Sequence, residues 1–403
     1  MPSPSRCITT RDIRRHVDEH VFADQGAQQV GIELEWVTNH APGTTVPGPA
    51  ELRPLVESSL PGASRLTFEP GGQLELSGPA HVGVGSAIGA MTADVASVRA
   101  ALDPAGVTLR GIGLDPSGMR DRVVTEPRYA AMEAYFDTRW PRGRTMMRNT
   151  ASVQVNLDLG GAALVDLRWQ RAHDLTPVLA AAFANSPFDV DGTPTGWRSS
   201  RLAVWRGIDP RRTRPAARAG LSAATAWTTY ALEAPVMLVR VGDACEVPSR
   251  PLPFARWIHD GHELGWPTLD DFEYHLTTLF PPVRPRGWLE LRTIDMLPDE
   301  WWPVAVAIAT ALLDAPEAAE VVDREAPALR HRGADAERLA MSDPTIEAVV
   351  ERCFAAALPA LATVGADRAT IEAAETYYER FIARGRCPAD DLHADPTWLR
   401  AVT

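Results

Sequence analysis

Two glutamates that alternate with hydrophobic residues are the strongest chemical signal in this sequence. The segment GIELEW at residues 31–36 has the period of two that predicts a half-buried strand. On such a strand Glu33 and Glu35 point to the same side, about 7 Å apart, and two neighbouring carboxylates repel each other unless a cation lies between them. Mg²⁺ takes hard oxygen ligands and often bridges to a substrate phosphate. The pair therefore favours a Mg²⁺ site, and the alternative is an edge strand with a charged outer face.

Three further stretches repeat this design of one hydrophobic and one polar face. They lie at residues 66–77, 151–159 and 288–292, and the first also contains a Pro-Gly-Gly turn that predicts a hairpin. Their polar faces carry Glu75, Gln154, Asn156, Glu290 and Arg292. A single sheet whose open face is lined with carboxylates would suit phosphoryl chemistry with two or three metal ions.

A patch that mixes arginines with indoles lies between residues 196 and 209. It contains Arg201 and Trp205 and would suit the binding of a small carboxylate or stacking on a flat ring. The alternative is a surface helix whose tryptophans belong to the core.

The composition narrows the classes of function. The chain has 403 residues, is 45% hydrophobic and carries a formal net charge of −12, which argues against nucleic acid or an anionic membrane as a partner. All 40 basic residues are arginines, which excludes a Walker-type phosphate loop, a Schiff-base cofactor and a catalytic lysine. Any cation that binds phosphate or carboxylate must therefore be an arginine or a metal ion.

The cysteines and the chain start indicate the compartment. The 4 cysteines are widely scattered without metal-binding spacing, so we expect reduced thiols and no structural disulfide. The start has no signal-peptide pattern, and no apolar run approaches the length of a membrane span. These features predict a cytoplasmic protein.

Hydrophobic periodicity outlines the remaining elements. Helices are expected at residues 13–21, 82–102, 128–136, 163–184, 301–313, 346–361 and 371–383. Further strands are expected at residues 107–114 and 236–241, and a loop rich in Pro, Gly and Ser at 39–64.

The strand motifs and their neighbours together resemble the glutamate–cysteine ligase family of the second, plant-type and bacterial, class. The matching pieces run in the family's order from residue 31 to about 296: GIELEW, FEPGGQLELSG, TASVQVNLD, FANSPF, the W-x-x-x-D of VWRGID, HLTTLFPPVR and WLELRTID. The lysine-free composition and the TIDMLPDEWW continuation resemble the actinobacterial branch, whose product is implied to feed ergothioneine synthesis.

The resemblance implies an α+β, glutamine-synthetase-like catalytic fold, with a funnel-shaped antiparallel sheet and helices packed outside it. It implies one catalytic domain over residues 1–403, with the core motifs at 31–296 and a helical part from about 298. The implied reaction joins L-glutamate to L-cysteine with ATP and two or three Mg²⁺ ions. The products would be γ-glutamylcysteine, ADP and phosphate, formed through a γ-glutamyl phosphate.

The resemblance also implies roles for individual residues. The metal ligands would be Glu33, Glu35, Glu75, Glu290 and Gln154, the last in the place where more distant relatives carry a histidine. Arg292 would meet the transferring phosphoryl group and act with Glu33 as a catalytic residue. The amino-acid substrate would be bound by Arg201, Trp205 and Asn156.

Three alternatives stay open at this point. The first is a ligase of the same fold that joins glutamate to a different amine. The second is a non-catalytic relative that senses a nucleotide or an amino acid. The third is a guanidino kinase of the same fold, which would need a cysteine near the site, and none of the cysteines lies in a recognisable loop of that kind.

Overall fold

The computed structural model describes residues 8–23, 28–40, 48–56 and 60–395, and its centre is an eight-stranded sheet. Six strands follow the order β2-β3-β1-β6-β10-β9, and every pair along this path is antiparallel. These strands are β2 (Arg65–Phe68), β3 (Leu74–Ser77), β1 (Gln29–His40), β6 (Ser152–Leu157), β10 (Leu289–Asp295) and β9 (Val283–Pro285). The four predicted strands therefore lie side by side, and the predicted antiparallel sheet is confirmed.

Strand β1 is the centre of this sheet and is longer than the predicted six residues. It pairs with β3 on one side and β6 on the other, and towards its ends with β4 (His81–Val82) and β5 (Val107–Arg110). Glu35 lies opposite Glu75, and Glu33 lies opposite Gln154. Because opposite residues of an antiparallel pair share a face, these polar side chains lie on one side of the sheet.

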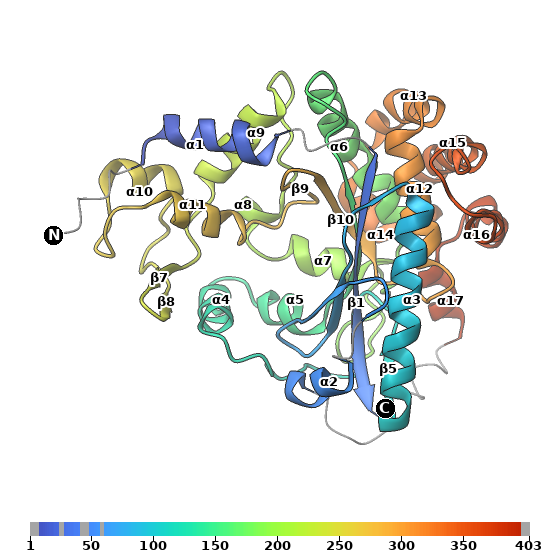
Figure 1. The fold of residues 1–403 in the computed structure, drawn as a ribbon, viewed down its shortest axis with the longest axis horizontal. Helices are drawn as coiled ribbons and strands as arrows, with labels where there is room; N and C mark the ends of the chain where they lie inside the picture. The colour runs from blue at the N-terminus through green and yellow to red at the C-terminus, as the bar shows by residue number, and fades with distance from the viewer. Residues whose placement is uncertain (1–7, 24–27, 41–47, 57–59, 396–403) are drawn as a thin grey trace.

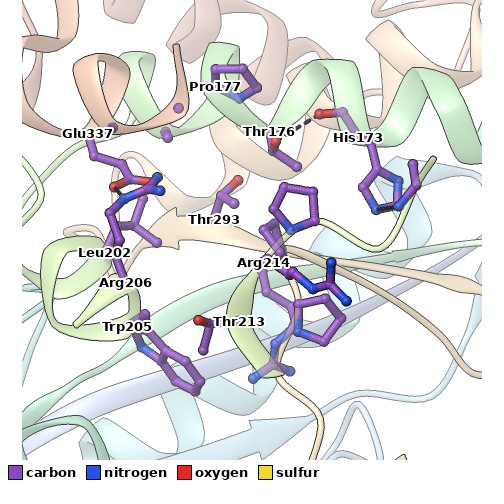
Figure 2. Close-up of a pocket in the computed structure, with 18 of the residues that line it drawn as sticks. His173, Thr176, Pro177, Leu202, Trp205, Arg206, Thr213, Arg214, Thr293 and Glu337 are labelled. Carbon is purple, nitrogen blue, oxygen red and sulfur yellow. Dashed lines mark hydrogen bonds and ion pairs between the residues drawn. The ribbon is translucent and has the colours of Figure 1, made fainter. Parts of the chain in front are cut away.

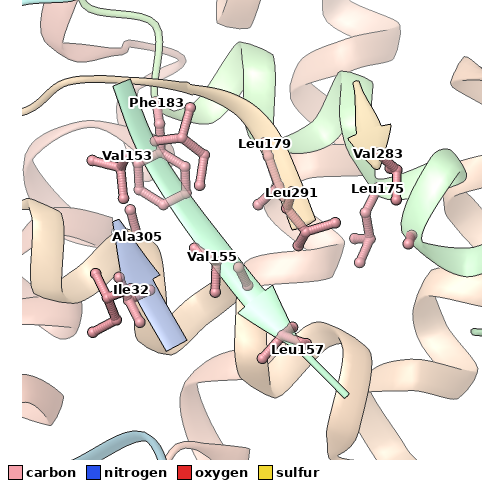
Figure 3. Close-up of a cluster of buried hydrophobic side chains, with 14 of the residues drawn as sticks. Ile32, Val153, Val155, Leu157, Leu175, Leu179, Phe183, Val283, Leu291 and Ala305 are labelled. Atoms are coloured by element: carbon pink, nitrogen blue, oxygen red, sulfur yellow. The ribbon is translucent and has the colours of Figure 1, made fainter. Parts of the chain in front are cut away.

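The other face of the sheet is hydrophobic and fully buried. It packs against α6 (Val165–Ala182) and α12 (Trp302–Asp314). Figure 3 shows the side chains that meet in this layer, including Ile32, Val153, Val155, Leu179, Phe183, Leu291 and Ala305. This packing fixes the strands, so that their polar face is presented on a rigid base.

Helices surround the sheet on both sides. In Figure 1, α3 (Val84–Leu102), α12, α15 (Pro344–Ala360) and α16 (Arg368–Arg380) lie on one side of β1. The other side carries α4 (Pro127–Asp137), α5 (Gly143–Asn149), α7 (Ser200–Arg206) and the hairpin of β7 (Val239–Val241) and β8 (Ala244–Glu246). The remaining helices are α1 (Thr10–His16), α2 (Pro49–Val56), α8 (Pro210–Thr213), α9 (Ala223–Glu233), α10 (Phe254–Asp260), α11 (Leu269–Leu276), α13 (Pro316–Glu325), α14 (Gly333–Leu339) and α17 (Pro388–Ala394).

The prediction of a loop over residues 39–64 is wrong in part. Strand β1 continues to His40, and α2 occupies residues 49–56; residues 41–47 and 57–59 lie outside the described part of the chain. Pro49 suits the first turn of a helix, and Leu52 and Val56, one turn apart, are buried. The strands expected at 107–114 and 236–241 form only over 107–110 and 239–241. None of the helices in the described ranges is long and apolar enough to cross a lipid bilayer.

Candidate active site

A continuous series of hydrogen bonds crosses the polar face of the sheet and joins most of the predicted site residues. Glu35 accepts hydrogen bonds from Ser152 Oγ (2.9 Å) and Gln154 Nε2 (2.8 Å). The amide oxygen of Gln154 accepts from Arg292 Nη1 at 2.7 Å, and the same nitrogen contacts Glu290. The structure therefore brings these residues from β1, β6 and β10 into one site.

The other two predicted carboxylates flank this series. Glu75 accepts hydrogen bonds from Thr67 (2.7 Å) and Ser77 (3.1 Å), its neighbours on the polar face. Glu33 accepts one from Asn156 Nδ2 at 3.1 Å. Asn156, which is predicted to bind the amino-acid substrate, lies between Glu33 and, across the β6–β10 pair, Glu290.

The carboxylates of β1 and β3 are held close together without enough positive charge between them. Burial raises the pKa of Glu33 to about 7, and the negative charges of Glu290 and Glu75 add to the effect. Burial likewise raises the pKa of Glu35 against the opposing attraction of Arg201 and Arg292. The pKa of Glu75 is raised by burial and by the charge of Glu35. A bound cation would relieve both the repulsion and the unfavourable burial of these charges.

Glu69 joins this cluster and was missed by the sequence reasoning. Burial raises its pKa well above the usual range, and the charges of Glu75 and Glu35 raise it further. Its main chain closes the turn between β2 and β3 by bonding to Gln73 and Gly72. Strand alternation cannot assign a direction to a turn residue, although its place in the FEPGGQLELSG motif was visible.

The donor set of this face fits Mg²⁺. In the part of the chain that the structure describes, no three acidic, histidine or cysteine side chains already converge as a metal-binding group. The available groups are nevertheless carboxylate and amide oxygens, which Mg²⁺ prefers, and Asn156 Oδ1 is buried without a hydrogen-bond partner. Glu33, Glu35, Glu75 and Glu69 could hold such an ion together with this oxygen.

Glu290 differs from the other carboxylates because arginines surround it. It is fully buried, and Arg284 binds it through two hydrogen bonds of 2.8 Å, from Nε and Nη2. Burial alone would raise the pKa of Glu290, but Arg284 and Arg292 outweigh it and lower the pKa to about 2. Arg284 was not singled out from the sequence, since it lies on a three-residue edge strand without a clear alternation.

The predicted Arg–Trp patch lies beside Arg292. Arg201 and Trp205, one turn apart on α7, approach it from the same direction. Arg201 Nη2 donates to the main-chain oxygen of Arg292 at 2.9 Å, and its Nη1 lies 3.6 Å from Asp295. The guanidinium of Arg292 lies over the ring of Trp205, 5.7 Å from its centre. The predicted patch therefore contacts Arg292, and Trp205 also packs against Phe280 as a core side chain would.

A cavity of about 570 Å³ begins beside Arg292 and Trp205 and extends between α6, α7 and α14 (Figure 2). A β-bulge between Leu291 and Ile294 inserts an extra residue into β10, and both Arg292 and Thr293 line the cavity. The other arginines in the lining are Arg201, Arg206, Arg214 and Arg330. Asp174 and Glu337 also line the cavity and pair with Arg330 and Arg206, so that arginines outnumber carboxylates. The volume and this excess of positive charge suit a small anionic metabolite such as an amino acid.

The described thiols lie away from this chemistry. Cys245, Cys353 and Cys387 are free, and none of these three lines the cavity; Cys7 lies outside the described residues. Burial raises the pKa of the Cys353 thiol to about 12, which makes it unreactive.

Comparison of the sequence with known proteins finds glutamate–cysteine ligases. A sequence model of "Glutamate-cysteine ligase family 2 (GCS2)" matches residues 29–398. The chain is 39% identical to the glutamate–cysteine ligase EgtA of Mycolicibacterium smegmatis over 96% of its own length and 92% of the relative's. It is 33% identical to a chloroplastic glutamate–cysteine ligase of Medicago truncatula, over 58% of this chain and 47% of that protein.

One solved structure supports the fold of this chain. The crystal structure of a glutamate–cysteine ligase from Francisella tularensis in complex with AMP superimposes with a TM-score of 0.54 at 12% identity. The match covers 92% of this chain and 86% of that one. Because the family model spans most of the sequence, the chain belongs to glutamate–cysteine ligase family 2.

Proposed function

We propose that this chain joins the γ-carboxylate of L-glutamate to the amine of L-cysteine at the expense of ATP, through a γ-glutamyl phosphate. The polar face of the sheet that carries Glu33, Glu35, Glu75 and Glu290 is called the carboxylate face below. The observation that carries the proposal is that this face meets the arginine-lined cavity at Arg292. The two amino acids are those in the name of the mycobacterial glutamate–cysteine ligases EgtA, to which the chain is similar over nearly its full length. This similarity also supports a place in ergothioneine synthesis.

The carboxylate face would bind the metal–nucleotide. Glu33, Glu35 and Glu75 are proposed as metal ligands. Glu290 and Gln154, at the end of the face next to Arg292, are proposed as metal ligands too. When bound there, two or three Mg²⁺ ions would neutralise the charge of the triphosphate.

Arg292 is proposed to stabilise the phosphoryl group as it moves to the γ-carboxylate. Its Nη1 is held by Glu290 and Gln154, and among the described residues its Nε and Nη2 have no hydrogen-bond partner. These N–H groups are therefore available to a ligand in the adjoining cavity. Donors fixed in place before the reaction stabilise developing charge without reorganisation.

The cavity would hold the amino acids. Arg201 and Trp205 are proposed to contact a substrate carboxylate, and burial around them would exclude water from the acyl phosphate. The cysteine amine then displaces phosphate, so no nucleophile from the protein is required.

We propose that residues 1–403 form one catalytic unit, consistent with the span of the family match, and that it works in the cytoplasm.

The test is a product assay with ATP, Mg²⁺ and pairs of amino acids. Glutamate with cysteine should release ADP and give a γ-linked dipeptide that mass spectrometry identifies. Glutamine should give nothing, because an amide has no carboxylate oxygen to phosphorylate. Aspartate should be poorer by about 100-fold, because its shorter side chain misplaces the carboxylate. 2-Aminobutyrate should retain part of the activity, since the amine is the nucleophile.

The same assay separates the alternatives. Faster turnover of glutamate with another amine would assign a different acceptor to the same fold. Binding of ATP without any dipeptide, under all pairs, would contradict catalysis and favour a sensor.

A further inference from the structure

The edge strand β9 supplies a buried arginine that the proposed mechanism does not use. Arg284 lies directly opposite Glu290 in the register of β9 and β10, and its side chain is only 13% exposed. Its Nε and Nη2 bind the two carboxylate oxygens of Glu290 separately, both at 2.8 Å. Its third nitrogen, Nη1, lies 3.4 Å from the main-chain oxygen of Leu279. This guanidinium is therefore occupied by the protein rather than offered to a ligand.

The two-point contact determines the orientation of Glu290. A carboxylate bound through both oxygens by one guanidinium is held in the plane of that guanidinium and cannot rotate about its last bond. One of these oxygens also contacts Arg292 Nη1, and Gln154 binds the same nitrogen from β6. The direction of the Arg292 guanidinium therefore depends on Glu290, and the direction of Glu290 depends on Arg284.

Strand pairing does not need this side chain. The main chain of β9 is aligned by Leu289 opposite Pro285 and Leu291 opposite Val283, on either side of Arg284. Nor is a third positive charge needed to neutralise Glu290, because Arg292 already contacts it and Arg286 lies 3.9 Å away. What Arg284 alone contributes is the fixed, planar geometry of its fork.

We propose that Arg284 is a positioning residue for the ligase reaction, acting through Glu290 to aim Arg292 at the transferring phosphoryl group. This role rests on the proposed function, in which Arg292 acts on the transition state. A positioning defect lowers kcat without weakening the binding of ground-state substrates.

The variant Arg284→Lys tests the two-point contact of the planar guanidinium with Glu290, because lysine keeps the positive charge and loses the planar geometry. Its kcat should fall roughly 10- to 100-fold, while the KM for glutamate and for cysteine stays within about twofold. ATP affinity without amino acids, measured by calorimetry, should also stay within about twofold, and the melting temperature should match that of the wild type. Arg286→Lys is the matched control, since it makes the same exchange at an arginine that is 48% exposed and lies beyond hydrogen-bond distance of Glu290, and it should leave all of these values unchanged.

A structural role would give a different pattern. In that case Arg284→Met would lower the melting temperature, and Arg284→Lys would restore melting temperature and kcat together. An Arg284→Lys enzyme with kcat within about twofold of wild type, or with a loss confined to KM, overturns the positioning role. If the wild type itself forms no γ-linked dipeptide, the proposed function falls and this role falls with it, whereas the Arg284 results alone leave the ligase assignment intact.

Discussion

At the scale of single residues, the glutamates of β1 and β3 carry charges that the folded protein alone does not need. Glu33→Gln or Glu75→Gln should lower turnover more than about 100-fold, because each removes a proposed metal ligand. Stability should be unchanged or higher, since the raised pKa of each carboxyl shows that its charge is unfavourable in this setting. Steady-state rates at limiting Mg²⁺ and melting temperatures measure both effects.

A glutamate outside the site provides the control for these variants. Glu375 is exposed on α16, so Glu375→Gln should change neither rate nor stability. Near-normal activity of Glu33→Gln at limiting Mg²⁺ would show that the carboxylate face does not bind the metal.

Arg292 can be tested separately from its supports. Arg292→Lys should lower kcat about 100-fold and change KM far less, because lysine cannot present the fixed N–H groups that face the cavity. Steady-state kinetics for each amino acid provide the measurement. An effect limited to KM would assign Arg292 to ground-state binding instead.

At the scale of elements, the hairpin of β2 and β3 is positioned by the close approach of its turn to α5. A Cβ on Gly71 would overlap the main-chain carbonyl of Arg148, and backbone cannot move aside as a flexible side chain can. Gly71→Ala should therefore cost at least about 2 kcal/mol in the free energy of unfolding and reduce activity, because the turn carries Glu69. Denaturant unfolding followed by circular dichroism measures the first effect.

The control for this substitution is Gly89→Ala on α3. Gly89 is exposed, and an added Cβ there would meet nothing within 4 Å. This change should stabilise the protein by up to about 1 kcal/mol, since alanine is the better helix former. Equal effects of the two substitutions would contradict the close approach at Gly71.

The elements also show how far the sequence could be interpreted. The four site strands were predictable because hydrophobic and polar residues alternate along each of them, as they do around Glu33, Glu75 and Glu290. Glu69 and Arg284 were not, because a turn and a three-residue edge strand have no periodicity to read. The hydrogen bonds that tie Gln154 to Arg292, and the β-bulge beside the cavity, depend on strand order and register, which one sequence does not specify.

At the scale of the whole molecule, two buried histidines link stability to pH. Burial lowers the pKa of His173 to about 4 and that of His275 to about 3. His173 lies between Trp169 and Ala217, with one nitrogen 2.9 Å from the Trp169 oxygen and the other accepting from the Ala217 N–H. This arrangement holds the neutral ring, whereas an unfolded histidine has a pKa near 6.5.

The sign of the effect follows from which state binds more protons. Between about pH 6.5 and 4 the unfolded chain is protonated at His173 and the folded one is not, so stability present above pH 6.5 is lost as the pH falls. The loss should approach about 1.4 kcal/mol per pH unit for this histidine. Denaturant unfolding between pH 5 and 7.5 should show a shallower slope for His173→Gln than for wild type or for His259→Gln, whose ring is exposed. Identical slopes would contradict a neutral His173.

The arginine lining of the cavity has a further chemical consequence. A guanidinium stays protonated and is not a nucleophile near neutral pH, and the chain contains no lysine at all. An acyl phosphate bound beside Arg201 and Arg292, as proposed, would therefore meet positive charge without meeting a lysine amine that it could modify. The cavity would attract an anionic intermediate and yet present no lysine that could compete with the incoming amino acid for the acyl group.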